Sequence, residues 1–294
     1  MNNSLVSCII PSFKRTDTLK RAIDSILAQT HKEIEVLVVD DNIPGDEYSN
    51  ALKDILKEYD ERVILVTQKK HINGAVARNE GVKASHGSFI AFLDDDDEWL
   101  PTKIERQLSI MKSYPNISGV AGGASLWRGD KEISTFIPRR VNINTLLLDV
   151  LTRKIGLATS TFICKKEAFI EMGGFDPNLK RSQDIQLFAD FLSKFQIYPM
   201  FEERTTRMYV ESSINRLNSQ KLAINKEELF HSIQSVLDQF SKATQKRIKS
   251  AHYYEVAYVA FKEKQYLFCI KYLIKGFCSP KSIVDLISRI KTRL

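Results

Sequence analysis

The first hundred residues alternate short apolar runs with amphipathic segments, and this alternation constrains the fold more than any other feature of the chain. The runs are rich in β-branched residues and read as buried strands, whereas apolar residues between them recur with helical spacing. Strands joined in this way by helices form a parallel sheet that is covered on both faces. We expect strands at 4–10, 34–39, 62–67 and 89–93, and helices at 16–30, 46–59 and 74–84.

The pattern changes after Pro101 and changes again near residue 216, which suggests a division of the chain. A helix-rich stretch with a few short strands comes first, and the remainder is mostly helical and basic. We expect a folded domain over 1–215 and a helical extension over 216–294. The elements expected after Pro101 are helices at 103–113, 142–151, 166–171 and 183–194, strands near 118–127, 133–137 and 158–164, and a turn at 173–177.

Four consecutive carboxylates, Asp94 to Asp97, follow the fourth expected strand and precede Trp99. Adjacent carboxylates repel one another, so a bound cation lowers the cost of holding them together. Mg²⁺ and Mn²⁺ prefer oxygen ligands and often bind carboxylates together with substrate phosphates. A solvated acidic turn is the alternative, but the position at the end of a buried strand favours a site for a metal and a diphosphate.

A second acidic segment, Asp40-Asp41-Asn42, follows the second expected strand. Ligands of open α/β sheets bind at the carboxyl ends of the strands, where such a carboxylate can accept hydrogen bonds from a base or a ribose. A helix cap or an Asx turn is the alternative.

Two further segments are expected near the same edge of the sheet. In 73–81, Gly74 at a helix start lets the backbone approach a ligand, and Arg78 could reach a phosphate or pair with an acidic strand end. Asp184 begins the helix that follows the turn at 173–177. A carboxylate there could act as a general base, or it could only complement the helix dipole.

Taken together, these segments resemble the family 2 glycosyltransferases with a GT-A fold. They follow one another with the family's order and spacing over about residues 4–190, and the combination is specific where no single segment is. The resemblance implies a mainly parallel Rossmann-like sheet, a nucleotide-binding half over 1–100 and an acceptor half over 101–215. The matching segments are 6–13, 25–30, 33–41, 73–81, 90–99 and 173–184.

The resemblance also implies the reaction, an inverting transfer of a sugar from a nucleotide-diphosphate donor, commonly a UDP-sugar, to an acceptor hydroxyl with Mn²⁺ or Mg²⁺. By analogy, Phe13 and Asp40 would hold the base, Asp96 the metal, and Asp184 would be the catalytic base. Gln183 stands where the family carries Glu, a departure that bears on the acceptor contacts. The donor-site candidates are Pro11, Ser12, Phe13, Arg15, Asp40, Asn73, Gly74, Arg78, Asp94 and Asp95.

Two other functions remain open from the sequence. A nucleotidyltransferase also uses carboxylates and Mg²⁺ at strand ends, but the glycine-rich loop expected after its first strand is missing from 11–15. A non-catalytic sugar-nucleotide-binding or scaffolding protein with the same fold is the other alternative, and Gln183 is its only support.

The positive charge of the chain lies in its last segment. Residues 241–294 hold 12 Lys and Arg against 3 Asp and Glu, although the whole chain has a net charge of only +7. In 281–294 the apolar residues fall on one helical arc bordered by basic ones, as in helices that bind anionic lipid, and 251–275 is rich in aromatic residues. Packing on the catalytic domain is the alternative. Because the main domain is not basic, no nucleic-acid partner is expected.

The remaining features concern the compartment. The longest apolar runs fall far short of the roughly 18 residues of a membrane span, and the first residues lack the pattern of a signal peptide. The four cysteines form no CxxC pair. We expect a cytoplasmic protein that is peripheral at the inner face of the plasma membrane if the tail binds lipid, and that acts on a saccharide or lipid-linked acceptor in bacterial surface polysaccharide synthesis.

Overall fold

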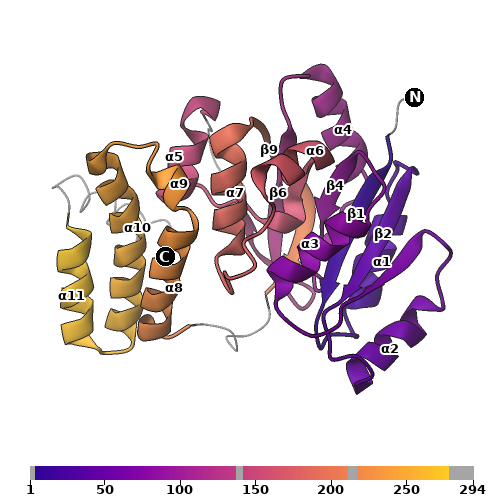
Figure 1. Cartoon of the computed structure of the whole chain (residues 1–294), viewed down its shortest axis with the longest axis horizontal. Helices are drawn as coiled ribbons and strands as arrows, with labels where there is room; N and C mark the ends of the chain where they lie inside the picture. The colour runs from indigo at the N-terminus through magenta and orange to yellow at the C-terminus, as the bar shows by residue number, and fades with distance from the viewer. Residues whose placement is uncertain (1–3, 137–141, 211–216, 278–294) are drawn as a thin grey trace.

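The computed structural model describes residues 4–136, 142–210 and 217–277. A nine-stranded sheet carries helices on both faces, and a group of helices stands at one end of the molecule (Figure 1). The strands are β1 (Val6–Ser12), β2 (Ile34–Asp40), β3 (Val63–Thr67), β4 (Phe89–Phe92), β5 (Glu98–Trp99), β6 (Gly119–Arg128), β7 (Lys131–Phe136), β8 (Phe162–Lys165) and β9 (Ile197–Tyr209). The helices are α1 (Leu19–Leu27), α2 (Glu47–Leu56), α3 (Gly74–Ala84), α4 (Lys103–Ser113), α5 (Leu146–Leu151), α6 (Lys166–Met172), α7 (Gln183–Lys194), α8 (Ser219–Ser232), α9 (Gln234–Leu237), α10 (Lys242–Lys262) and α11 (Tyr266–Gly276).

The first half of the sheet confirms the predicted α/β fold. Strands β3, β2, β1 and β4 lie side by side in that order, and each pair is parallel. Ser12 at the end of β1 pairs with Asp40 at the end of β2, so the carboxyl ends of these strands lie at one edge. This edge receives both acidic segments.

Beyond β4 the sheet becomes mixed. Strand β8 is antiparallel to both β4 and β6, and β7 is antiparallel to β6. Only two residues, Gly129 and Asp130, join β6 to β7. A connection that short is possible only between antiparallel strands.

The longest strand, β9, is absent from the sequence prediction. It has 13 residues, pairs in parallel with β6 and antiparallel with β5, and its pairing with β6 shifts register beside Gly122 and Gly123. Pro199 and the charged residues from Glu202 to Arg207 interrupt any apolar alternation. The strand therefore follows from its pairing with β6 and not from its own pattern.

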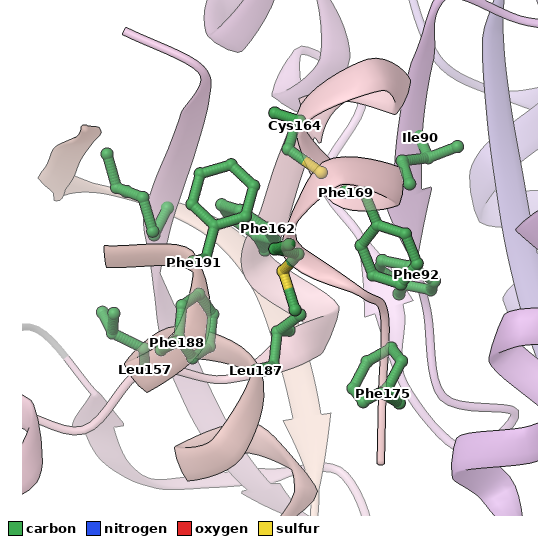
Figure 2. Packing of buried hydrophobic residues seen from close by; sticks show 14 of the residues in the cluster. Ile90, Phe92, Leu157, Phe162, Cys164, Phe169, Phe175, Leu187, Phe188 and Phe191 are labelled. Carbon is green, nitrogen blue, oxygen red and sulfur yellow. The ribbon is translucent and has the colours of Figure 1, made fainter. Parts of the chain in front are cut away.

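Burial on both faces explains why the first strands are almost continuously apolar. Along β1, Cys8 and Ile10 pack with the residues of α1, α2 and α4, whereas Ile9 packs with those of α3, α6 and α7. The cluster that contains Ile9 is rich in aromatic side chains (Figure 2). Its Phe162 ring lies 5.0 Å from that of Phe188 and 5.2 Å from that of Phe191. These contacts hold α7 on the sheet.

The turn before α7 depends on two glycines in the left-handed region. Gly173 has φ +102° and Gly174 has φ +74°, backbone conformations that L side chains rarely adopt. They lead the chain from α6 to Phe175, whose ring packs 5.4 Å from that of Phe92. The first turn of α7, which carries Asp184, follows this anchored segment.

The C-terminal helices pack on the domain that precedes them. Phe230 of α8 and Val256 of α10 share a buried cluster with Leu151, at the end of α5, and with Ile185 and Ala189 of α7. Packing is therefore what the structure gives for 251–260 and for Cys269 and Tyr272, whereas much of 261–275 is exposed and 281–294 lies outside the described residues. Among the described residues, no helix is long and apolar enough to cross a membrane. The boundary near residue 215 stays a prediction.

Candidate active site

The acidic run forms a turn directly after β4. The N–H of Asp97 donates to the carbonyl oxygen of Asp94 at 3.0 Å. Asp94, Asp96 and Asp97 each offer a carboxylate oxygen, and these oxygens lie within 4.8 Å of one another. An all-oxygen set of this kind fits Mg²⁺ or Mn²⁺. The structure thus brings the expected Asp96 together with Asp94 and with Asp97, which was not among the predicted site residues.

Asp97 is held by the strand that sequence reasoning missed. Its Oδ1 accepts a hydrogen bond from the N–H of Tyr209, at the end of β9, over 3.2 Å. Burial raises the pKa of Asp97 well above the ordinary value, and the charge of Asp94 adds to the rise. The only sequence signal for Asp97 was its place in the acidic run.

Asp95 does not join this set of three oxygens. It is buried, and its Oδ1 lies 3.4 Å from Nη1 of Arg15. Burial and the neighbouring Asp96 raise the pKa of Asp95 to about 7, although Arg15 opposes the rise.

Two arginines balance the charge of the run. Arg15 forms an ion pair with the carboxylate of Asp96. Arg21, on α1, donates from Nη2 to the carbonyl oxygen of Asp96 at 2.6 Å, and its guanidinium carbon lies 3.7 Å from the ring centroid of Tyr209. The sequence predicted Arg15 but not Arg21, which no motif distinguishes from other helix residues.

Arg78 links α3 to the acidic run and to α7. It forms an ion pair with Asp94, and its Nη1 donates to Oε1 of Gln183 over 3.0 Å. A Cβ atom on Gly74 would lie only 2.9 Å from Nη1 of Arg78, so the glycine makes room for the guanidinium. Burial lowers the pKa of Arg78, but Asp94 and Asp184 outweigh it and raise the pKa above its usual value.

Asp184 lies in the first turn of α7, within electrostatic reach of Asp94 and Arg78. Its Oδ1 accepts hydrogen bonds from the hydroxyl of Thr159 and, at 3.3 Å, from the N–H of the same residue. Burial raises the pKa of Asp184 and Asp94 adds to the rise, whereas the Thr159 hydroxyl and the charge of Arg78 partly oppose it. A carboxylate with a raised pKa is a better proton acceptor.

The two carboxylates after β2 have different surroundings. Asp40 accepts hydrogen bonds at Oδ1 from the backbone N–H (3.0 Å) and the side chain (2.8 Å) of Asn42, and at Oδ2 from the hydroxyl of Ser49 (2.6 Å). This is the Asx-turn arrangement, which braces the start of α2. Asp41 instead lies with Oδ2 3.0 Å from Nδ1 of His71, whose ring stacks 3.9 Å from that of Phe13.

The other candidates at this edge have clear local roles. Ser12 donates from its hydroxyl to the carbonyl oxygen of Arg15 at 3.2 Å, and Pro11 precedes it in β1. Phe13 is more than one-third exposed, at 37%. Asn73 caps α3 and donates from Nδ2 to the carbonyl oxygen of Pro177 at 2.9 Å, which ties the helix to the turn before α7.

A half-sheet of parallel strands that ends in an acidic run, continued by antiparallel strands and faced by a helix with a carboxylate in its first turn, is the arrangement of a GT-A glycosyltransferase. The sequence profile described as "Glycosyl transferase family 2" matches residues 7–172, and the chain belongs to that family. The resemblance inferred from the motifs is thereby confirmed.

The chain is similar in sequence to two named glycosyltransferases and in fold to one solved structure. It is 30% identical over 217 residues to TuaG of Bacillus subtilis (strain 168), which is provisionally named a teichuronic acid biosynthesis glycosyltransferase; the match covers 72% of this chain and 81% of that protein. It is 36% identical over 148 residues to WfgD of Escherichia coli, a UDP-Glc:alpha-D-GlcNAc-diphosphoundecaprenol beta-1,3-glucosyltransferase; this match covers 50% of the chain and 56% of that protein. A crystal structure of S. aureus TarS in complex with UDP-GlcNAc superimposes with a TM-score of 0.70 over 92% of this chain and 79% of that one, at 15% identity.

Proposed function

We propose that the chain is an inverting, metal-dependent glycosyltransferase that moves a sugar from a UDP-sugar to a hydroxyl of a lipid-linked glycan in bacterial surface polysaccharide synthesis. The observation that supports it most is the group of three carboxylate oxygens after β4, with Asp184, in the first turn of α7, within electrostatic reach of Asp94. The named donors of WfgD and of the TarS complex support a UDP-sugar, and the diphosphoundecaprenol in the name of WfgD supports a lipid-linked acceptor.

In this proposal Asp184 is the general base. Its carboxylate takes the proton of the acceptor hydroxyl as the new bond forms between that oxygen and the anomeric carbon. The bond from the anomeric carbon to the diphosphate oxygen breaks, and the nucleoside diphosphate leaves with the electron pair. Attack from the face opposite the leaving group inverts the anomeric centre. The Thr159 hydrogen bonds to Oδ1 hold the carboxylate in one orientation.

The donor is held by the residues at the carboxyl edge. The exposed ring of Phe13 offers a stacking surface for the base. Both Asp40 and Asp41 accept hydrogen bonds within the chain, but Asp41 is the better candidate to contact the base, because its Oδ2 faces His71, whose ring stacks on Phe13. Arg15 and Arg78 form ion pairs with carboxylates of the acidic run and would contact the phosphates.

Asp94, Asp96 and Asp97 would hold the Mn²⁺ or Mg²⁺. A bound divalent cation stabilises the growing charge on the diphosphate leaving group. Asp96 also pairs with Arg15, whose guanidinium would offer further positive charge to the diphosphate.

Thermal unfolding with UDP, GDP, CDP or dTDP, each with and without Mn²⁺, tests this proposal. A ligand at 100 times its dissociation constant stabilises the folded state by about 2.7 kcal/mol, which is a rise of several degrees in Tm. We expect UDP to give this rise only with Mn²⁺, and Asp96→Asn to abolish it. Asp130→Asn, in the exposed turn between β6 and β7, is the matched control and should respond like the parent.

The alternative of a non-catalytic binding protein gives a different outcome. Such a protein would show the same rise in Tm with UDP and Mn²⁺ but no sugar transfer to any acceptor. Gln183 was the only sequence support for this alternative, and its role in binding Arg78 gives the residue a use in an active enzyme. A lack of any rise in Tm with all four diphosphates would refute the donor site itself.

A further inference from the structure

The outermost helix of the C-terminal group, α11, presents an apolar face to solvent. It packs on α10 through the buried Cys269 and Tyr272, and no other labelled helix lies on its outer side (Figure 1). On that outer side Leu267 is 87% exposed and Ile274 is 71% exposed. Tyr266, Ile270, Leu273 and Phe277 are also exposed.

These side chains form one continuous surface. At 100° per residue, Tyr266, Leu267, Ile270, Leu273 and Ile274 fall within an arc of about 120°. The exposed ring of Phe261, at the end of α10, lies 6.3 Å from that of Tyr266 and extends the surface. We call this set, with Phe277, the α11 face. A contiguous apolar patch of this kind on a soluble protein marks an interaction site.

The border of the α11 face is basic. Lys262, Lys264 and Lys271 are exposed beside it. Glu263 lies between Lys262 and Lys264 and offsets one of these charges, and its carboxylate also accepts a hydrogen bond from the N–H of Ser219 at 3.0 Å. Glu227 pairs with Lys275 at 2.7 Å. The surface therefore combines exposed apolar side chains with a net positive charge.

The positive charge of the border distinguishes among the partners that could cover the α11 face. The segment 278–294 holds four basic residues and one acidic residue, so it would bring like charge against the lysines of the border. A second copy of the chain, docked through the same face, would do the same with its own lysines. An anionic partner with an apolar interior avoids both conflicts.

We propose that the α11 face binds the surface of an anionic lipid bilayer, with the apolar side chains at the level of the acyl boundary and the lysines among the headgroups. Interfacial helices have this combination of an apolar face, aromatic residues and a basic border. The proposal goes beyond sugar transfer and does not rest on it, because none of its residues belongs to the active site.

Co-sedimentation of the full chain with phosphatidylglycerol-containing vesicles, compared with pure phosphatidylcholine vesicles, tests the proposal. The double variant Leu267→Gln/Ile274→Gln should bind the anionic vesicles at least about tenfold more weakly, since two apolar side chains leave the acyl boundary. The matched control is Ile170→Gln on α6, a position that is 60% exposed, and it should bind like the parent. Both side chains of the double variant are exposed, so its Tm and its response to UDP should stay unchanged.

Salt and a charge variant complete the test. Binding of the parent should weaken as NaCl is raised, and Lys262→Gln/Lys264→Gln/Lys271→Gln should weaken it further at low salt. Parent-like binding by the Leu267→Gln/Ile274→Gln variant would overturn the proposal and point to another segment as the anchor. Equal binding of the parent to both kinds of vesicle, or to neither, would also overturn it.

Discussion

Glu255 is the centre of a buried ionic group that joins the C-terminal helices to the rest of the chain, and Glu255→Gln should measure its strength. The Oε2 of Glu255, on α10, lies 3.1 Å from Nζ of Lys226 on α8, and its Oε1 lies 3.6 Å from Nη2 of Arg153, just after α5. His252, one turn before Glu255 on α10, is fully buried and lies with Nε2 3.0 Å from the carbonyl oxygen of Leu151.

The magnitude follows from the pKa of Glu255. Burial alone would raise it, but Arg153 and Lys226 outweigh burial and lower the pKa from 4.5 to about 2. One pKa unit corresponds to about 1.4 kcal/mol, so the charged carboxylate stabilises the folded state by about 3 kcal/mol at pH 7. A folded-state pKa below the unfolded one gives stability that is present above about pH 4.5 and is lost as the pH falls toward 2.

Urea unfolding of the parent and of Glu255→Gln checks this value. We expect the variant to lose about 3 kcal/mol of unfolding free energy at pH 7, and the difference between the two proteins to shrink to about 1 kcal/mol at pH 3. Glu227→Gln is the matched control, because its pair with Lys275 is half exposed and should contribute less than about 1 kcal/mol. The double variant Lys226→Met/Glu255→Met should recover part of the loss, since it removes the buried charge of Lys226 and leaves only the partly exposed guanidinium of Arg153 without this carboxylate.

Two results would refute the reasoning. One is a loss at pH 7 no larger than that of Glu227→Gln. The other is a loss that is the same at pH 7 and pH 3, because that would assign the effect to packing and not to the charge of Glu255.

Three further predictions concern the active site and the core. Asp184→Asn should lower turnover by about 10²- to 10⁴-fold while the affinity for UDP, measured by calorimetry, stays within a few-fold; normal turnover would exclude Asp184 as the base. Asp41→Asn should weaken UDP binding about tenfold and Asp40→Asn should leave it within a few-fold of the parent, whereas both should lower Tm, because each carboxylate accepts hydrogen bonds from buried neighbours; the reverse pattern of UDP binding would return the base contact to Asp40. Phe162→Ala should cost about 3–5 kcal/mol in urea unfolding, and a loss under 1 kcal/mol would mean that the aromatic cluster repacks around the cavity.

The parallel half of the fold could be predicted because each of its strands and helices has a recognisable pattern within its own residues. Strands buried on both faces are continuously apolar, and helices α3, α4 and α7 begin and end at the residues that the periodicity gave. Strand β9 could not be predicted in this way. Its residues become a strand because β6 and β5 offer hydrogen-bonding partners on either side, and that information is not in the segment itself.

The residues of the candidate site likewise fall into those that the sequence could predict and those that depend on the tertiary fold. The acidic run and Arg78 stand out in the sequence, and the structure brings Asp94, Asp96 and Arg78 together. The different hydrogen-bond partners of Asp40 and Asp41 cannot be predicted from the spacing of residues. They depend on which carboxylate Ser49 and Asn42 reach after the chain turns into α2. Arg21 depends likewise on how α1 lies against the acidic run.

Helix α7 belongs to two cores at once. Phe188 and Phe191 anchor it to the sheet (Figure 2), while Ile185 and Ala189 lie in the cluster with α8 and α10. Because α7 is shared between two buried clusters, the position of a junction matters when such enzymes are recombined into chimeras. A chimera that exchanges residues 1–100 leaves the cluster of Ile185 and Ala189 within one parent, whereas a junction between α7 and α8 separates these two residues from their partners on α8 and α10. Exchange of acceptor specificity should therefore treat α5 through α11 as one inherited unit.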